Sequence, residues 1–185
     1  MDSFGYLSIL LSIIIGLAVT QILQGMRALI LARKRARLFA PSLIWAVVLL
    51  IMATQMWWST FGLRGHTGWT FGLYGLILLQ MALFYLACGL VLPDLGPNKI
   101  DLEADYFAHR RWFFGLLASA ALVSISKDVA FDGKLPGTTN LIFHAVLIIS
   151  CAAAILSPNK RYHTILAPAS LLLFGGYIAL LFANL

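Results

Sequence analysis

Three ionisable residues fall inside long apolar segments of the sequence: Lys127, Asp128 and His144. Charges within a membrane span are costly, and by default they indicate a functional site. Asp128 and His144 come from neighbouring segments joined by a short turn. Because histidine titrates near neutral pH, a contact between them would let protonation change helix packing. A histidine satisfied by its own surroundings, such as Asn140 one helical turn away, is the structural alternative.

Lys127 lies near the far end of its apolar segment, where a lysine can extend its ammonium to the lipid headgroups. Adjacent side chains leave a helix in different directions, so we do not expect Lys127 and Asp128 simply to neutralise each other. Anchoring at the interface is therefore the structural interpretation of Lys127. Membership of a proton-linked site with Asp128 and His144 is the functional interpretation.

A second pattern consists of small or weakly polar residues at every fourth position of the first apolar segment. These residues are Ser8, Ser12, Gly16, Thr20 and Gln24, with Gln21 beside them. Residues four apart lie on one side of a helix, so they form a slowly winding stripe. In lipid, such a stripe allows close helix approach and interhelical hydrogen bonds. We expect it to face protein, as a packing surface or as part of a wetted pathway.

Two glutamines, Gln55 and Gln80, fall near the middle of the second and third apolar segments. They could therefore meet at a similar depth. An unsatisfied amide in lipid costs several kcal/mol, so each needs a partner. The sequence favours either a hydrogen bond between the two amides or a role for both in lining a solute path.

The longest polar stretch, residues 96–112, precedes the fourth apolar segment. It starts with the capping residue Asn98, has acids in its first two turns and ends in Arg110, Arg111 and Trp112, an order that the helix dipole favours. We expect a short amphipathic helix on the inner leaflet, or an extension of the following span. Its basic and aromatic end would bind lipid headgroups or dock a cytoplasmic partner.

Enzyme chemistry has little support in the sequence. There is no HExxH, GxSxG or phosphate-loop motif, and no acidic cluster within a span that would hold a metal. Cys88 and Cys151 have no partner at metal-ligand spacing, and they are expected to be packing residues. His144 alone lies well inside a span, so paired haem ligands are not expected. We expect no cofactor and no metal, and a lipid-modifying enzyme is the remaining enzymatic alternative.

The elements that position these residues are predicted to be transmembrane helices. The chain has 185 residues, of which 61% are hydrophobic and 11% charged, whereas a soluble domain is about 45–50% apolar and about 25% charged. A span needs about 20 mostly apolar residues. The sequence predicts an all-α integral membrane protein, a single transmembrane domain over 1–185. The expected spans are residues 4–31, 41–61, 69–92, 112–131, 138–156 and 163–184.

The basic residues predict the orientation, because short cytoplasmic loops carry an excess of lysine and arginine. Of the 13 bases, the following are assigned to the inner side: Arg27, Arg33, Lys34, Arg35, Arg37, Lys99, Arg110, Arg111, Lys160 and Arg161. Arg64, Lys127 and Lys134 are assigned to the outer side. We expect both termini outside, in a bacterial inner membrane. The net charge of +6 is explained by this distribution, so nucleic acid is not an expected partner.

Three motifs resemble those of small bacterial inner-membrane proteins with six spans and no assigned activity. They are the segment Gly16–Gly25, the pair Trp57 and Trp58, and the segment Tyr106–Phe114. The resemblance covers most of the chain and implies a multi-span membrane protein. It implies no activity and no functional residues.

The sequence favours a small non-enzymatic membrane protein with a channel-like or transporter-like role. The polar stripe of the first segment and the amides near mid-depth motivate this interpretation. The lipid bilayer and further copies of the chain are the expected partners. The alternative is an accessory or assembly subunit of a larger membrane complex, which the same stripe and the amphipathic segment would serve.

Overall fold

The computed structural model describes residues 3–93 and 99–181, and this part of the chain is helical apart from its turns and one short strand pair. The helices are α1 (Ser3–Leu31), α2 (Ala40–Thr60), α3 (Phe71–Leu90), α4 (Leu102–Asp132), α5 (Thr138–Leu156) and α6 (Lys160–Leu181), with a 3₁₀ turn η1 (Phe61–Leu63). Each of the six α-helices is long and apolar enough to cross a membrane. The predicted number and order of the apolar helices are therefore confirmed within the described residues.

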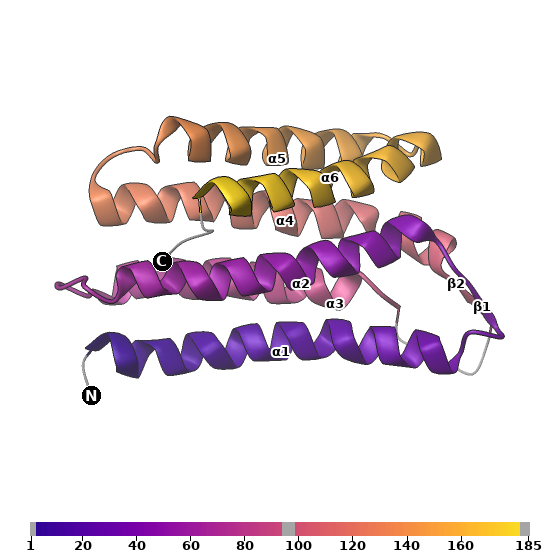
Figure 1. The fold of residues 1–185 in the computed structure, drawn as a ribbon, viewed down its shortest axis with the longest axis horizontal. Coiled ribbons are helices and arrows are strands. Elements are labelled where there is room, and N and C mark those ends of the chain that lie inside the picture. The colour runs from indigo at the N-terminus through magenta and orange to yellow at the C-terminus, as the bar shows by residue number, and fades with distance from the viewer. Residues whose placement is uncertain (1–2, 94–98, 182–185) are drawn as a thin grey trace.

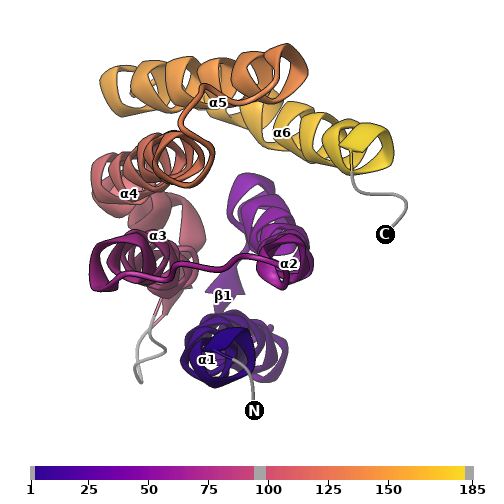
Figure 2. The ribbon, with the colours of Figure 1, turned by 90° about the vertical axis from the view of Figure 1, so that its left-hand side faces the viewer.

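The six helices run roughly along one common direction (Figure 1) and form a ring rather than two layers (Figure 2). Around the ring the order is α1, α3, α4, α5, α6 and α2, and each of these neighbours is in contact. A ring of this kind surrounds a central axis, so what fills the middle decides whether the bundle is solid or hollow.

One end of the ring, here called the basic end, is closed by paired loops. The strands β1 (Ala36–Arg37) and β2 (Ile100–Asp101) pair in parallel there (Figure 1). Arg37 contacts the carboxylate of Asp101 at 3.1 Å and that of Glu103 at 3.5 Å, and Lys160 contacts Glu103 at 2.7 Å. These contacts tie the segments before α2 and α4 to the first turns of α4 and α6.

The start of α4 differs from the expected short amphipathic helix. The structure has one continuous helix from Leu102 to Asp132, so the alternative of an extension of the fourth span is correct. Asp101 is the N-cap and accepts hydrogen bonds from the amides of Glu103 and Ala104, whereas Asn98 lies outside the described residues. Leu102 and Tyr106 share a face as expected, but this face is buried in the bundle and does not lie on lipid.

The opposite end, here called the cavity end, is formed by residues 61–70 between α2 and α3 and by residues 133–137 between α4 and α5. Its aromatic rings pack edge to face: His66 lies 4.8 Å from Phe131 and 5.3 Å from Trp69, centroid to centroid. No described ion pair joins these two turns to each other, in contrast to the loops at the basic end.

Candidate functional site

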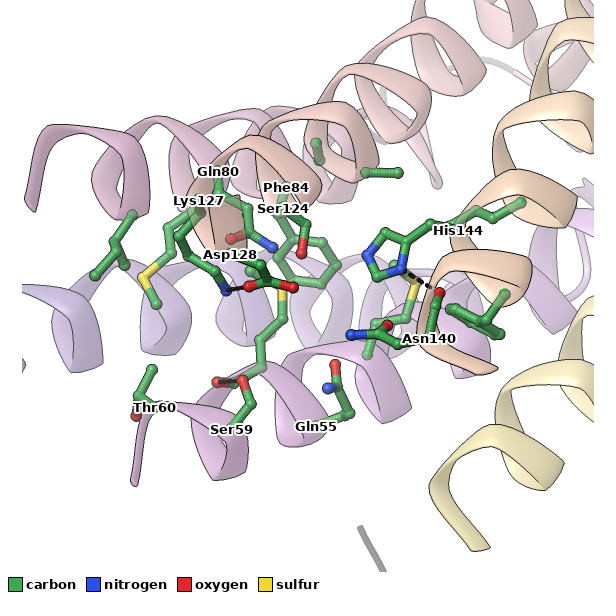
Figure 3. Close-up of a pocket in the computed structure, with 18 of the residues that line it drawn as sticks. Gln55, Ser59, Thr60, Gln80, Phe84, Ser124, Lys127, Asp128, Asn140 and His144 are labelled. Atoms are coloured by element: carbon green, nitrogen blue, oxygen red, sulfur yellow. Dashed lines mark hydrogen bonds and ion pairs between the residues drawn. The ribbon is translucent and has the colours of Figure 1, made fainter. Parts of the chain in front are cut away.

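A cavity of about 320 Å³ lies within the ring, in the half nearer the cavity end (Figure 3). Side chains from α2, α3, α4, α5 and α6 line it. Gly62 and Asp132, both exposed at the cavity end, belong to its lining, so the cavity opens there. Most of the ionisable and amide residues that the sequence analysis selected from α2 to α5 meet in this one space.

The charged part of the cavity comes from the last two turns of α4. That helix ends where Gly133 adopts a left-handed conformation (φ 66°), which favours glycine, and the Gly133 amide donates to Val129 O. Lys127 and Asp128, one turn earlier, both line the cavity, and Lys127 Nζ lies 3.6 Å from Asp128 Oδ1. These two charged groups, which we did not expect simply to neutralise each other, thus lie at the distance of a loose ion pair.

The same geometry changes the interpretation of Lys127 as a headgroup anchor. Its side chain is 18% exposed, and its ammonium lies over the cavity beside Asp128 (Figure 3). A lysine that extended to the headgroups would point away from the bundle axis. Lys127 is therefore close to the end of α4, as expected, but directed inward.

His144 lies nearly two turns into α5, with its ring buried against the cavity. Its Nδ1 is 2.8 Å from the backbone oxygen of Asn140. Because a carbonyl oxygen can only accept, Nδ1 carries the proton, and Nε2 of the neutral ring is an acceptor. Figure 3 shows this second nitrogen on the cavity side. Asn140 and His144 are thus partners through the backbone, while Tyr177 donates its hydroxyl to Asn140 Oδ1 at 3.0 Å.

Asp128 and His144 face the same cavity, but no ion pair or hydrogen bond joins them among the described residues. Gln55 and Gln80 also both line it, and the described part of the chain contains no hydrogen bond between the two amides. Of the two alternatives for these glutamines, the structure shows them lining a shared space. Ser124, one turn before Asp128, adds a hydroxyl to the same wall.

Apolar side chains close the cavity toward the basic end. Phe84, Leu117, Leu147 and Phe174 contribute its floor, one each from α3, α4, α5 and α6, and all four are buried. Beyond them the core is filled by aromatic rings. The polar space is therefore open at one end and blocked at the other.

Sequence reasoning missed a buried polar pair behind this floor. His163 was assigned to the start of the sixth span, but α6 begins at Lys160 and His163 is fully buried. Its Nε2 donates to Ser157 O at 2.9 Å, and its Nδ1 lies 2.9 Å from the hydroxyl of Tyr106, which donates to it. Both nitrogens are satisfied, so this histidine is a structural tie between α4 and α6.

The polar stripe of the first segment lies mostly on the outer surface. Ser12, Gly16, Thr20 and Gln24 are exposed and Ser8 is half-buried. Three hydroxyls are satisfied within the helix: Ser8 donates to Gly5 O, Ser12 to Ser8 O and Thr20 to Gly16 O. Hydroxyls bonded to their own helix need no neighbour, so within one chain the stripe neither lines a path nor faces protein.

The side of α1 that does contact the bundle carries Gln21 and Gly25, which lie one turn apart. A Cβ on Gly25 would lie 3.0 Å from Leu92 Cβ, and one on Gly89 would lie 2.9 Å from Gln21 Oε1. The close approach of α1 to α3 therefore depends on Gly25 and Gly89. Gln21 belongs to this interface and does not line the cavity.

Arg110, Arg111 and Trp112 lie on α4 toward the basic end. Arg110 donates to Phe107 O at 3.0 Å, whereas Arg111 and Trp112 are exposed, Trp112 to 73%. Nearby, the pKa of Asp101 is lowered, first by the hydrogen bond from the Ala104 amide and then by Arg37. The acids of this segment thus bind within the chain, whereas the side chains of Arg111 and Trp112 are exposed.

No group of three or more histidine, cysteine or acidic side chains within 3–93 and 99–181 could hold a metal. Cys88 and Cys151 are separate buried thiols, as expected for packing residues. Searches against protein-family models, curated proteins and solved structures found no match to this chain. The class that the structure supports is an all-helical protein with six helices compatible with membrane spans.

Proposed function

We propose that this protein is a small multi-pass membrane protein that binds a polar solute in the cavity and carries it across the bilayer. The observation that supports this proposal is the cavity itself, because it places Lys127, Asp128 and His144 inside a ring of apolar helices. Polar and charged groups at membrane depth are expensive, and they mark substrate or ion pathways. The cavity opens at one end and is closed at the other, which is the geometry of one state of an alternating-access cycle.

The basic residues support the orientation of this carrier. With the basic end in the cytoplasm, the positive-inside rule is obeyed and the cavity opens to the outside of a bacterial inner membrane. The loops tied together by Arg37, Glu103 and Lys160 would then form the inner closure. Release of a solute inward requires these contacts and the apolar floor to separate.

Uptake into liposomes tests the proposal. The purified protein is reconstituted, and entry of radiolabelled valine, choline, propanesulfonate and xylitol is followed, which covers a zwitterion, a cation, an anion and a neutral solute. We expect uptake of at least one of them above empty liposomes. Ser124→Phe, which fills the cavity, should abolish that uptake, whereas Ser126→Phe, on the exposed face of the same helix, should preserve it. Equal uptake by both variants would contradict the proposal.

An accessory subunit is a second candidate, and the exposed stripe on α1 favours it. Gln24 presents its amide on the outer face of the helix with no hydrogen bond within the described residues, and an amide in lipid needs a partner. A second copy or a different subunit would supply one. Extraction in mild detergent distinguishes these cases: foreign subunits in fixed ratio, with no uptake by the isolated chain, would favour the accessory role.

A further inference from the structure

We propose that the cavity selects a small zwitterion, with an ammonium and a carboxylate close together and a short apolar side chain. This inference rests on the proposed function, because it names the class of solute for the same cavity. The contacts of Lys127 and Asp128 carry it, together with the groups that surround them.

The pair of charges in the cavity is loosely made. Lys127 Nζ and Asp128 Oδ1 are 3.6 Å apart, whereas a charge-assisted N–H···O hydrogen bond is about 2.7–2.9 Å long. Neither group makes another ion pair or hydrogen bond within the described residues. A lysine has three donors and a carboxylate about four acceptor positions, so both groups retain capacity for a ligand.

Charge balance then selects the ligand. A bound cation that occupied Asp128 would leave Lys127 uncompensated, and a bound anion would leave Asp128 uncompensated. An unpaired charge away from water costs several kcal/mol. A zwitterion supplies both signs, so its carboxylate can pair with Lys127 while its ammonium pairs with Asp128. Asp132, also on the lining, is exposed at the end of α4 and is therefore screened by water.

The neighbouring polar groups suit the two ends of such a ligand. In the neutral form of the His144 ring, Nε2 is an acceptor on the cavity side, which is what an ammonium requires. Asn140 Oδ1 is occupied by the Tyr177 hydroxyl, and Figure 3 shows the amide nitrogen of Asn140 directed into the cavity. That nitrogen is a donor with no hydrogen bond to the described part of the chain, so it can bind a carboxylate. The acceptor and the donor thus line the same cavity as the charged pair, from the neighbouring helix α5.

The size and the floor of the cavity define the rest of the ligand. Its volume of about 320 Å³ is at the lower end of the range of about 300–1,000 Å³ for ligand sites. Phe84, Leu117 and Phe174 present an apolar floor below the charged layer. A ligand that enters with its charged end toward the opening would place a short hydrocarbon group against this floor.

Three ligands of matched shape test the inference by titration calorimetry on the purified full chain in mild detergent. Valine is the zwitterion, isobutylammonium lacks its carboxylate, and isovalerate lacks its ammonium. We expect valine to bind at least about tenfold more tightly than either of the others, which corresponds to about 1.4 kcal/mol. Binding of either single-charge ligand as tightly as valine would overturn the inference.

Two substitutions should exchange this preference. Asp128→Asn leaves Lys127 unpaired, so isovalerate should become the best of the three ligands. Lys127→Met leaves Asp128 unpaired, so isobutylammonium should become the best. Lys134→Met, in the exposed turn after α4, should leave the order of the wild type unchanged. If either cavity variant fails to fold, the order of affinities of the wild-type protein for the three ligands still tests the inference.

The outcomes separate this inference from the proposed function. If valine does not bind while the liposomes take up choline, propanesulfonate or xylitol, the inference of a zwitterionic ligand is wrong and the proposal of a carrier is retained. If none of the matched ligands binds and none of the four labelled solutes enters, both proposals are wrong. Binding and uptake of valine, both lost in Asp128→Asn, would support both.

Discussion

The two ends of the helical ring carry their polar groups in different ways. At the basic end, Tyr106, His163, Arg37 and Glu103 are all paired with groups of the same chain, and the core between the helices is filled by aromatic rings. At the cavity end, polar groups line a space, and Lys127 and Asp128 meet only loosely. Polar groups whose hydrogen bonds are satisfied within the chain stabilise a structure, whereas polar groups with unused donors or acceptors can bind a ligand. The comparison therefore assigns stability to one end and binding to the other.

The largest expected effect on stability is at Phe114, which is fully buried between Trp45 and Phe113 at centroid distances of 5.3 and 4.9 Å. Phe114→Ala should lower the free energy of unfolding by about 3 kcal/mol, the lower end of the range for such truncations, because lipid reduces the transfer term. Phe131→Ala, at the cavity end, should cost less than half as much. Unfolding by SDS from mild detergent measures both.

Phe71, which is 93% exposed, provides the control for this pair, and Phe71→Ala should leave the unfolding free energy nearly unchanged. Equal losses for the truncations at Phe114 and Phe131 would remove the contrast between the two ends.

A smaller loss is expected at the buried tie between α4 and α6. Tyr106→Phe removes the hydroxyl that donates to His163 Nδ1, and a buried acceptor left without a partner costs about 1–3 kcal/mol. The same unfolding measurement should show this loss. The Tyr85 hydroxyl makes no hydrogen bond within the described part of the chain, so Tyr85→Phe should be close to neutral. A comparable loss there would show that the Tyr106 hydroxyl has no special role.

The smallest effect is expected at Asp101, whose pKa is lowered by the Ala104 amide and by Arg37. Because the folded pKa lies below the ordinary value of 3.8, the stabilisation is fully present above that value and is lost as the pH falls through the lowered pKa. Asp101→Asn keeps an N-capping side chain but cannot titrate. The melting temperature of this variant should therefore fall less steeply on acidification than that of the wild type.

Asp132→Asn, at the exposed end of the same helix, is the control for this pH dependence. The melting temperature of Asp132→Asn should fall on acidification in parallel with that of the wild type. If Asp101→Asn and wild type lose stability in parallel on acidification, the Arg37 and Ala104 contacts do not contribute to the closure of the basic end.

The helices were predictable because long apolar runs bounded by charges leave few alternatives in lipid. The start of α4 was not predictable, because the charges between Glu103 and Arg111 reduce the local hydropathy. In the structure, the Asp101 cap and the buried face of Leu102 and Tyr106 extend the helix through this segment. Only tertiary contacts distinguish a buried amphipathic turn from one that lies on the lipid surface.

His163 could have been found from its spacing. Residues 163, 167, 170, 174 and 177 recur at steps of three and four, and all five are buried in α6. The capping residue Asn159, which accepts from the Arg161 amide, places the helix start before His163. Capping and periodicity together therefore predict an inward-facing histidine, which a window of hydropathy alone does not.

The site was predictable in its members but not in its assembly. Lys127, Asp128, His144, Gln55 and Gln80 were all selected from the sequence, and all five line one cavity. The stripe from Ser8 to Gln24 was misleading, because hydroxyls can bond to their own helix and then need no protein neighbour. Which polar side chains share a space depends on the order of helices around the ring, and the sequence does not specify that order.

Accessibility of a single thiol tests most directly the claim that the cavity end is hollow and the basic end closed. Cys88 and Cys151, both buried, are replaced by Ala, and one new cysteine is introduced at Ser124 in the cavity wall or at Ser42 near the start of α2. Both serines are buried, to 9% and 1% exposure. Thr67→Cys and Lys34→Cys, in exposed turns at the two ends, identify the faces of the membrane.

The account predicts that a small charged methanethiosulfonate labels Ser124→Cys faster from the face that labels Thr67→Cys than from the opposite face, which the cavity reaches only in the inward-open state of the carrier. Ser42→Cys should resist labelling from both faces. Faster labelling of Ser124→Cys from the face that labels Lys34→Cys, or its failure to react from either face, would contradict a water-filled cavity closed at the basic end.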